Sequence, residues 1–356
     1  MRYLLPIALC LILIIPSVSA QPSADGKLPT IAEKTTGAER SSGFFTYYWD
    51  AKSGKIWLAI AKFDAEFLYV GSLPAGVGSN DIGLDRGQYG GIHVVRFERT
   101  GPKILLIEPN YSYRAVTDAA AERKAVDESF ARSVLWGFDV AAASGDTVLV
   151  DATSFFLRDA HNVAGTIKAA NQGNYRLDPS RSAFYLPRTK NFPKNTEVEV
   201  TLTFAGDDPG GYLQSVTPSA QSVTVREHHT FLELPDNGYH PRRFDPRGGF
   251  FYTEYYDYAT PVGEPVSQKL IVRHRLEKKD PSAAVSEPVK PILYYLDRGV
   301  PVVHGIVAAV VRRRRDRRLS TWRTALVESA AYLPVAHAGA GVVEALAGES
   351  VPGRGG

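Results

Sequence analysis

Short apolar and aromatic runs, separated by polar turns, fill most of the chain between residues 44 and 276. The runs at 44–49 and 55–60 flank a polar segment at 50–54, a pattern typical of a β-hairpin. Residues 197–204 alternate polar and apolar side chains, which predicts an antiparallel strand with one buried face. Further strands are predicted at 67–70, 92–98, 104–108, 138–141, 147–151, 222–227, 229–234 and 269–276. The predicted fold is mostly β, with curved or sandwich-like antiparallel sheets.

A few helices are expected between these strands, which makes the fold class α+β overall. Thr117 can cap the start of one helix, and Gly137 can end it. Between them, Val126, Phe130 and Val134 recur every four residues, as the apolar face of an amphipathic helix does.

The N-terminus predicts export. Residues 4–15 are largely apolar, follow Arg2 and are short for a membrane span. Residues 18–20 match a signal-peptidase site, so we predict a signal peptide over 1–20, cleavage after Ala20 and a periplasmic or secreted protein. Residues 21–42 are polar and predict a flexible lead-in. Cys10 is the only cysteine and lies in the predicted leader, which excludes disulfide and thiol chemistry from the mature chain.

The amino-acid composition of the C-terminal tail differs from that of the rest of the chain. The chain has 356 residues, 44% hydrophobic and 22% charged, as an ordinary globular protein does. The net charge is +3, yet residues 301–356 hold eight arginines against four acidic residues. Arginine, alanine, glycine and valine share GC-rich codons, so we interpret 302–356 as an irregular, non-native tail read out of frame. Membrane contact by this tail is the less favoured alternative, and export argues against nucleic acid as a partner.

Motifs for catalysis and metal binding are missing from the sequence. It contains neither His-Glu-x-x-His nor Gly-x-Ser-x-Gly, so no catalytic or metal-ligating residue is assigned. His228, His229 and His240 cluster, but neighbouring strand residues face opposite sides of a sheet, which disfavours a shared metal. Glu254 and Asp257 stand among aromatic residues, as the two carboxylates of a glycosidase can. Their separation is not encoded in the sequence.

Residues 71–91 are rich in glycine and predict a long flexible loop. They lack the Gly-Lys-Ser/Thr element and the strand-loop-helix context of a phosphate site. Asn80, Asp81 and Asp85 could offer oxygen atoms to calcium, but their spacing is not that of an EF-hand.

Four ordered segments carry a family signal, at 232–239, 243–247, 273–281 and 294–299. Together they closely resemble the region just before the catalytic domain in a family of large exported bacterial zinc metallopeptidases of metzincin type. The segment 80–88 resembles the upstream, uncharacterised domain of the same family, and the likeness runs from about residue 43 to about residue 301. The resemblance implies a β-rich N-terminal region over 43–280 and a linker over 281–301 into a catalytic domain.

The zinc ligands of that family have no matching residues here, because the likeness stops before its extended His-Glu-x-x-His motif. We therefore expect no cofactor in this chain, although the intact family carries zinc, and we expect the chain to be inactive. Asp245 is predicted to accept from backbone amides in a turn whose arginines pair with carboxylates. A structural role is expected for the motif residues Asn80, Asp81, Asp85, Arg86, Arg243, Asp245, Arg247, Arg273, Arg275, Asp297 and Arg298.

Three functions remain open from the sequence. The first is an accessory, non-catalytic region of a zinc metallopeptidase. The second is an autonomous periplasmic module that binds glycan or polypeptide on a platform formed by Tyr47, Tyr48, Trp49, Tyr255 and Tyr256. The third is a carbohydrate hydrolase that uses Glu254 and Asp257.

Overall fold

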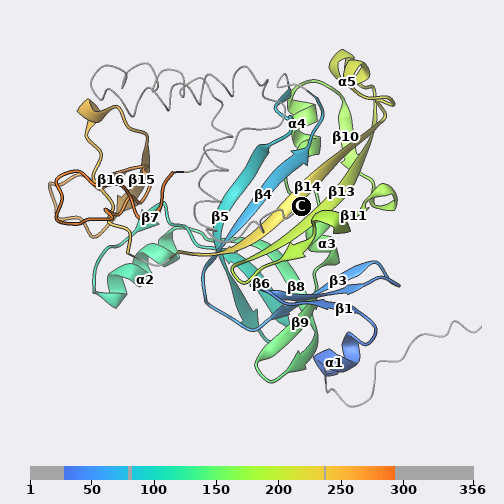
Figure 1. Ribbon diagram of the computed structural model, residues 1–356, viewed down its shortest axis with the longest axis horizontal. Coiled ribbons are helices and arrows are strands. Elements are labelled where there is room, and N and C mark those ends of the chain that lie inside the picture. Colours follow the sequence, from blue (N-terminus) through green and yellow to red (C-terminus); the bar gives the residue numbers. More distant parts are fainter. Residues whose placement is uncertain (1–27, 79–81, 236–237, 293–356) are drawn as a thin grey trace, which may run out of the picture.

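A computed structural model describes residues 28–78, 82–235 and 238–292 (Figure 1). Within these residues the protein is mostly β, with a large antiparallel sheet, a small three-stranded sheet and several short helices. The predicted fold class, mostly β and α+β overall, is confirmed. Asn80, Asp81, Asp297, Arg298 and the tail at 302–356 lie outside the described residues.

The large sheet contains thirteen of the strands in the described part of the chain, in the order β1-β2-β3-β9-β8-β6-β5-β4-β14-β13-β10, with β11 and β12 also paired to β13. Its strands are β1 (Glu39–Ser41), β2 (Thr46–Asp50), β3 (Lys55–Ile60), β4 (Phe67–Ala75), β5 (Gln88–Thr100), β6 (Lys103–Glu108), β8 (Ser133–Ser144), β9 (Thr147–Asp151), β10 (Asn174–Leu177), β11 (Ala183–Phe184), β12 (Lys190–Asn191), β13 (Asn195–Asp207) and β14 (Ser222–Glu233). Several strands that pair in the large sheet are also consecutive in the sequence, so tight turns join them. The predicted turn at 50–54 and the turn at Gly101 are both present.

The two edges of the large sheet meet along a seam, so that the sheet is nearly closed. The amide of Phe44 donates to the carbonyl of Phe192 at 2.8 Å. Asn191 Nδ2 donates to the carbonyls of Ser41 and Phe45 at 3.0 and 2.7 Å. These bonds use edge groups that would otherwise stay unpaired. Only glycine fits at Gly43, because a Cβ there would overlap the Asn191 side chain and lie 2.7 Å from the Phe192 carbonyl oxygen.

Aromatic side chains fill the space inside the curved sheet. Phe45, Phe67, Phe97 and Phe231 are buried, and their ring centroids lie 5.0 to 5.6 Å apart in several edge-to-face or tilted pairs. Strand alternation explains the arrangement, since every second residue of each strand points inward. Burial of these rings supplies much of the apolar stabilisation of the fold.

Short helices and 3₁₀ turns precede or connect the strands. They are α1 (Ile31–Lys34), α2 (Ala120–Ser129), α3 (Thr153–Phe156), α4 (Val163–Ala169) and α5 (Gly211–Val216), with 3₁₀ turns η2 (Pro179–Arg181), η3 (Leu186–Arg188) and η4 (Pro246–Gly248). Helix α1 begins with a capping box, in which the Thr30 side chain accepts from the Glu33 amide and the Glu33 carboxylate accepts from the Thr30 amide. Ile31 of this helix packs with Trp57 and Leu149 on the outer face of the sheet.

The small sheet has the order β16-β15-β7 and lies to one side of the large sheet, next to α2 (Figure 1). Strand β15 (Tyr252–Asp257) pairs antiparallel with β16 (Ser267–Ile271) and parallel with β7 (Tyr113–Arg114). Tyr113 stacks on Phe130 at 3.9 Å between ring centroids, which ties the end of α2 to this sheet.

Three expectations need correction. The helix predicted from Thr117 toward Gly137 ends at Ser129, and Val134 and Gly137 lie in β8, because this segment pairs with β6 instead. The flexible lead-in does not hold for its described part, where α1 and β1 form. The glycine-rich loop is shorter than expected, since residues 71–75 and 88–91 belong to β4 and β5. No helix among the described residues is long and apolar enough to cross a membrane.

Candidate functional site

The candidate site is a groove on the outer side of the large sheet, between α1 and the seam. It has a volume of about 600 Å³. Its walls come from α1, β1, β2 and the ends of β3, β8 and β9, so residues from 31 to 147 meet there. The side chains that line it are Ile31, Ala32, Thr35, Arg40, Phe44, Phe45, Thr46, Tyr48, Ala59, Ala61, Lys62, Ser144 and Thr147, with Gly43. We call this set the α1 groove.

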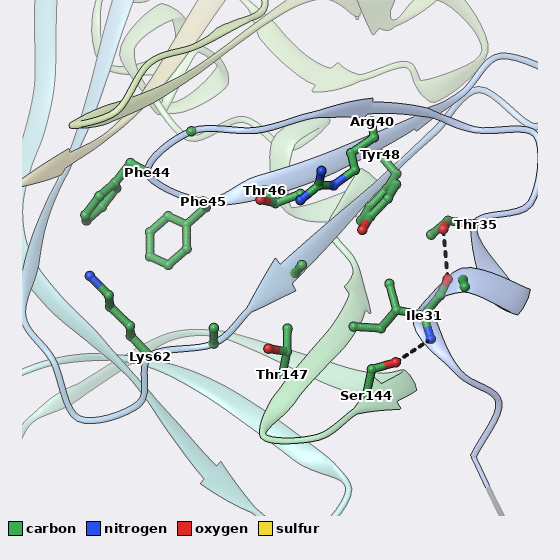
Figure 2. A pocket seen from close by; sticks show the side chains of 14 residues that line it. Ile31, Thr35, Arg40, Phe44, Phe45, Thr46, Tyr48, Lys62, Ser144 and Thr147 are labelled. Carbon is green, nitrogen blue, oxygen red and sulfur yellow. Dashed lines mark hydrogen bonds between the residues drawn. The ribbon is translucent and has the colours of Figure 1, made fainter.

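The floor and walls of the α1 groove combine apolar, hydroxyl and cationic groups. Figure 2 shows the Arg40 side chain running beside Tyr48 with its guanidinium toward Thr46, while Lys62 extends on the side of Phe44 and Phe45. The start of α1 is held against the end of β8, because the Ile31 amide donates to Ser144 Oγ at 3.1 Å. No aspartate or glutamate lines the groove. Its lining therefore favours a ligand with a negative charge.

A second polar assembly lies inside the large sheet, and we call it the interior network. His229 of β14 is buried, and its Nε2–H donates to the carbonyl of Phe156 at 3.0 Å. Its Nδ1 then accepts from the Tyr69 hydroxyl at 2.9 Å, and Arg158 Nη2 donates to that hydroxyl oxygen at 3.2 Å. The guanidinium of Arg158 also covers the Phe155 ring at 4.6 Å. The interior network therefore fixes the loop after α3 against β4 and β14.

Glu227 is the carboxyl group of the interior network. It is 2% exposed, and its Oε2 accepts from the Ala160 amide at 3.0 Å. Burial, together with the nearby Asp159 carboxylate, raises the pKa of Glu227 to about 8. Asp159 instead accepts from the amides of Val163 and Ala164 at 2.6 and 3.0 Å at the start of α4. Glu227 is therefore protonated at neutral pH.

Burial lowers the pKa of His229 to about 3, and the charge on Arg158 acts in the same direction. The ring is therefore neutral, which agrees with Nδ1 acting as an acceptor. His161 Nδ1 is buried close by without a hydrogen-bond partner among the described residues. Glu227 Oε1 also lacks a hydrogen-bond partner among the described residues. The bonds that are present link Tyr69, Phe156, Arg158 and Ala160 to two side chains of β14, so we assign the interior network a structural role.

His228 faces the other side of β14 from His229, as the alternation argument predicted. Its Nε2 lies 2.6 Å from Glu197 and its Nδ1 lies 3.0 Å from Glu199. Burial favours the neutral ring, but the hydrogen bonds to the two carboxylates outweigh it and raise the pKa of His228 to about 9. Arg226 Nη1 and Arg188 Nε lie 3.3 and 3.9 Å from the buried Glu199, so this acid has three cationic partners with His228. This cluster is a cross-strand clamp between β13 and β14.

Comparison with known families identifies the central part of the chain. A family model described as a domain of unknown function, DUF5117, matches residues 87–279, more than half of the chain. The chain belongs to the DUF5117 family. No curated protein and no solved structure matched it.

The DUF5117 match begins at β5, inside the large sheet. Strands β1 to β4 precede residue 87, yet they pair with β9, β5 and β14 in the same sheet. The folded unit that contains the DUF5117 segment therefore starts well before the matched residues. The α1 groove is built mainly from this preceding part, whereas the interior network joins Tyr69 to residues inside the match.

The motif residues near the end of the DUF5117 segment gather beside the small sheet. Asp245 accepts from the Arg247 amide at 2.9 Å and pairs with Arg247 Nη2 at 2.6 Å, whereas Arg243 forms no ion pair with the residues that the structure describes. Arg243 forms a β-bridge with Leu270. Arg273 Nη2 donates to the His240 carbonyl at 2.7 Å and lies over the Tyr239 ring.

The remaining described motif residues lie apart from that turn. Arg275 pairs with Glu277 at 2.5 Å. Asp85 Oδ1 accepts from Gln88 Nε2 at 2.6 Å, before β5, and Arg86 follows it in the turn. These contacts are local and stabilise turns. The motif residues that the structure describes therefore do not converge on one site, and their family role stays a prediction.

Glu254 and Asp257 do not face a common cleft. They are three positions apart on β15, so alternation directs them to opposite faces. Glu254 accepts from Ser267 Oγ at 2.5 Å, while Asp257 accepts from the amides of Val116 and Ala259 at 2.9 and 3.0 Å. Their geometry does not support the glycosidase hypothesis.

The proposed aromatic platform is likewise divided. Tyr47 points into the core, and Trp49 packs on Phe184 at 5.6 Å between ring centroids, so Tyr48 alone of this run faces the α1 groove. Tyr255 belongs to the small sheet, where Arg114 lies over its ring. The five aromatic residues therefore do not form one surface.

Side chains that could hold a metal are not grouped. Among residues 28–78, 82–235 and 238–292, no three or more His, Cys, Asp or Glu side chains are placed to bind a metal ion. His240 is exposed and apart from the clamp formed by His228. Sequence reasoning missed the interior network and the α1 groove, both of which depend on contacts between distant segments.

Proposed function

We propose that this chain is the accessory, non-catalytic N-terminal region of an exported zinc metallopeptidase, and that its small sheet docks the catalytic domain. The resemblance of residues 243–247 and 273–281 to the segment before a metzincin-type domain motivates the family assignment. The membership in DUF5117 is compatible with such an uncharacterised upstream region.

The observation that carries the docking role is the concentration of exposed apolar side chains around the small sheet. Twelve of the twenty exposed large hydrophobic residues in the described chain lie between 250 and 292. Phe251, Val262 and Val285 are 82%, 107% and 89% exposed. An accumulation of this kind marks an interaction surface in a stable soluble protein. The resemblance continues from this surface toward the position of the catalytic domain, which supports that domain as the occupant.

A binding experiment tests the docking role. The full chain is mixed with the separately purified zinc-peptidase domain of an intact relative and followed by analytical ultracentrifugation. We expect a one-to-one complex, and we expect the triple variant Phe251→Ser, Val262→Ser, Val285→Ser to weaken it about tenfold or more, since large apolar anchors dominate interface energetics.

The control removes exposed apolar groups from the large sheet. Ile92 and Val134 are 53% and 54% exposed, so the double variant Ile92→Ser, Val134→Ser should bind as the unchanged chain does. Absence of a complex at about 100 μM, or equal weakening by the control, would contradict the docking role. Hydrolysis of a casein substrate by the chain alone with added zinc would contradict the non-catalytic assignment.

A further inference from the structure

Two cations in the α1 groove have no partner among the described residues. Arg40 extends from the edge strand β1, and Lys62 follows the end of β3, so they approach the groove from different elements (Figure 2). Neither side chain forms a hydrogen bond or an ion pair with the residues that the structure describes. The neighbouring Lys55, in contrast, pairs with Asp151 at 2.8 Å. The groove therefore presents two positive charges that an anionic ligand can neutralise.

The groove is also too large and too apolar for a simple ion. Its volume of about 600 Å³ falls in the range of sites for extended organic ligands. Phe44 supplies an apolar wall backed by the buried Phe45, and the hydroxyl groups of Thr46 and Tyr48 add hydrogen-bonding capacity between that wall and Arg40. A suitable ligand combines a carboxylate with an apolar group and further polar atoms.

These features favour polypeptide over glycan. Sugar rings stack on open, flat aromatic faces, but Phe44 packs edge-to-face with Phe45 at 4.7 Å and with Phe67 at 6.1 Å between ring centroids. No carboxylate lines the groove to accept from sugar hydroxyls. A peptide needs neither feature, because its acidic side chain can pair with the cations while a neighbouring apolar side chain packs on Phe44.

We infer that the α1 groove binds an acidic segment of polypeptide, whose carboxylate is attracted by Arg40 and Lys62 and whose adjacent apolar side chain packs against Phe44. The lining comes mostly from strands outside the DUF5117 match, and the inference does not depend on the proposed docking of a peptidase domain.

Calorimetric titration of the full chain tests this site. The probe is a blocked hexapeptide of alanines that carries one glutamate next to one phenylalanine, and the comparison peptide has glutamine in place of the glutamate. We expect the glutamate peptide to bind at least about tenfold more tightly, because charge-assisted bonds exceed neutral ones in strength. Binding should also weaken as salt is raised, since both cations are exposed.

Variants locate the binding. Arg40→Met and Lys62→Met should each weaken binding of the glutamate peptide about tenfold and bring its affinity close to that of the glutamine peptide. Ala61→Trp should also reduce it, because the larger side chain enters the groove from an exposed position. Lys52→Met is the matched control, since Lys52 is an exposed cation on the nearby β2–β3 turn outside the groove, and it should leave binding unchanged.

Three outcomes would overturn the inference. One is equal affinity for the two peptides, and another is equal loss in Lys52→Met and Arg40→Met. The third is binding of an acidic sugar, tested with a glucuronate disaccharide, that depends on Arg40 and Lys62 while the glutamate peptide does not bind. Each result leaves the docking experiment with the peptidase domain unaffected, so the two proposals fail separately.

Discussion

At the scale of single residues, Glu227 is a buried carboxyl group whose surroundings disfavour its charged form. Its folded pKa of about 8 lies above the ordinary value of 4.5 because burial and Asp159 both oppose ionisation. The contribution of Glu227 to stability is therefore complete below pH 4.5 and is lost as the pH rises toward 8, since the unfolded chain ionises first. The wild-type free energy of unfolding should fall across this window.

We predict that Glu227→Gln removes this part of the pH dependence. The amide keeps the shape of the protonated carboxyl and does not ionise, so the two proteins should have similar stability near pH 4.5. Above pH 8 the variant should be more stable by up to about 4 kcal/mol. Urea unfolding at closely spaced pH values measures the difference. Parallel stability curves for the two proteins would show that Glu227 ionises freely in the fold.

The sequence held a partial signal for this network. In β14 the inward positions run Val223, Val225, Glu227, His229 and Phe231, so two polar residues interrupt an apolar face. The alternation predicted correctly that His228 and His229 face opposite sides. It could not reveal the partners, because Arg158 and Asp159 lie about seventy positions away and meet Glu227 and His229 only after the sheet curves.

At the scale of elements, the hydrophobic pattern predicted strands well where turn residues mark their ends in the sequence. The hairpin of β2 and β3 and the strand β13 follow their periodicity closely. The predicted helix is longer than α2 because Phe130 and Val134 continue the four-residue spacing of its apolar side chains. Pairing of residues 133–139 with β6 outweighs that local preference. The seam, the α1 groove and the small sheet involve contacts across long sequence separations, which periodicity does not encode.

The seam provides a prediction at this scale, centred on Asn191. Its amide donates to two carbonyls of the 41–45 segment, and its Oδ1 accepts from Thr196 Oγ1 at 2.7 Å. Asn191→Ala removes these three hydrogen bonds, although Thr196 Oγ1 still donates to the Phe45 carbonyl at 3.2 Å, and it should lower the free energy of unfolding by about 2 kcal/mol. Asn174 is exposed on the edge strand β10, so Asn174→Ala should have little effect. Equal urea midpoints for the two variants would show that Asn191 does not hold the edges together.

At the scale of the whole molecule, every strand of the large sheet precedes β15 and β16, the last two strands of the small sheet, in the described sequence. Strand β14 ends at Glu233, and no later strand among the described residues joins the large sheet. The small sheet is tied to the rest through β7, for example by the Tyr256 amide donating to the Ser112 carbonyl at 2.8 Å. A three-stranded sheet of this size with exposed apolar faces has little stability of its own. The large sheet should therefore govern the thermal unfolding of the chain.

We predict that a chain ending at Pro235 still folds. It retains all strands of the large sheet, the interior network and the α1 groove, so its melting temperature should lie within a few degrees of that of the full chain. Circular dichroism and calorimetry measure this, and the glutamate peptide should bind the shortened chain as tightly as the full one. Loss of a cooperative transition on truncation would mean instead that residues 238–292 and the large sheet fold as one unit. In that case the exposed apolar side chains near Phe251 would belong to a region that the large sheet needs for its own stability.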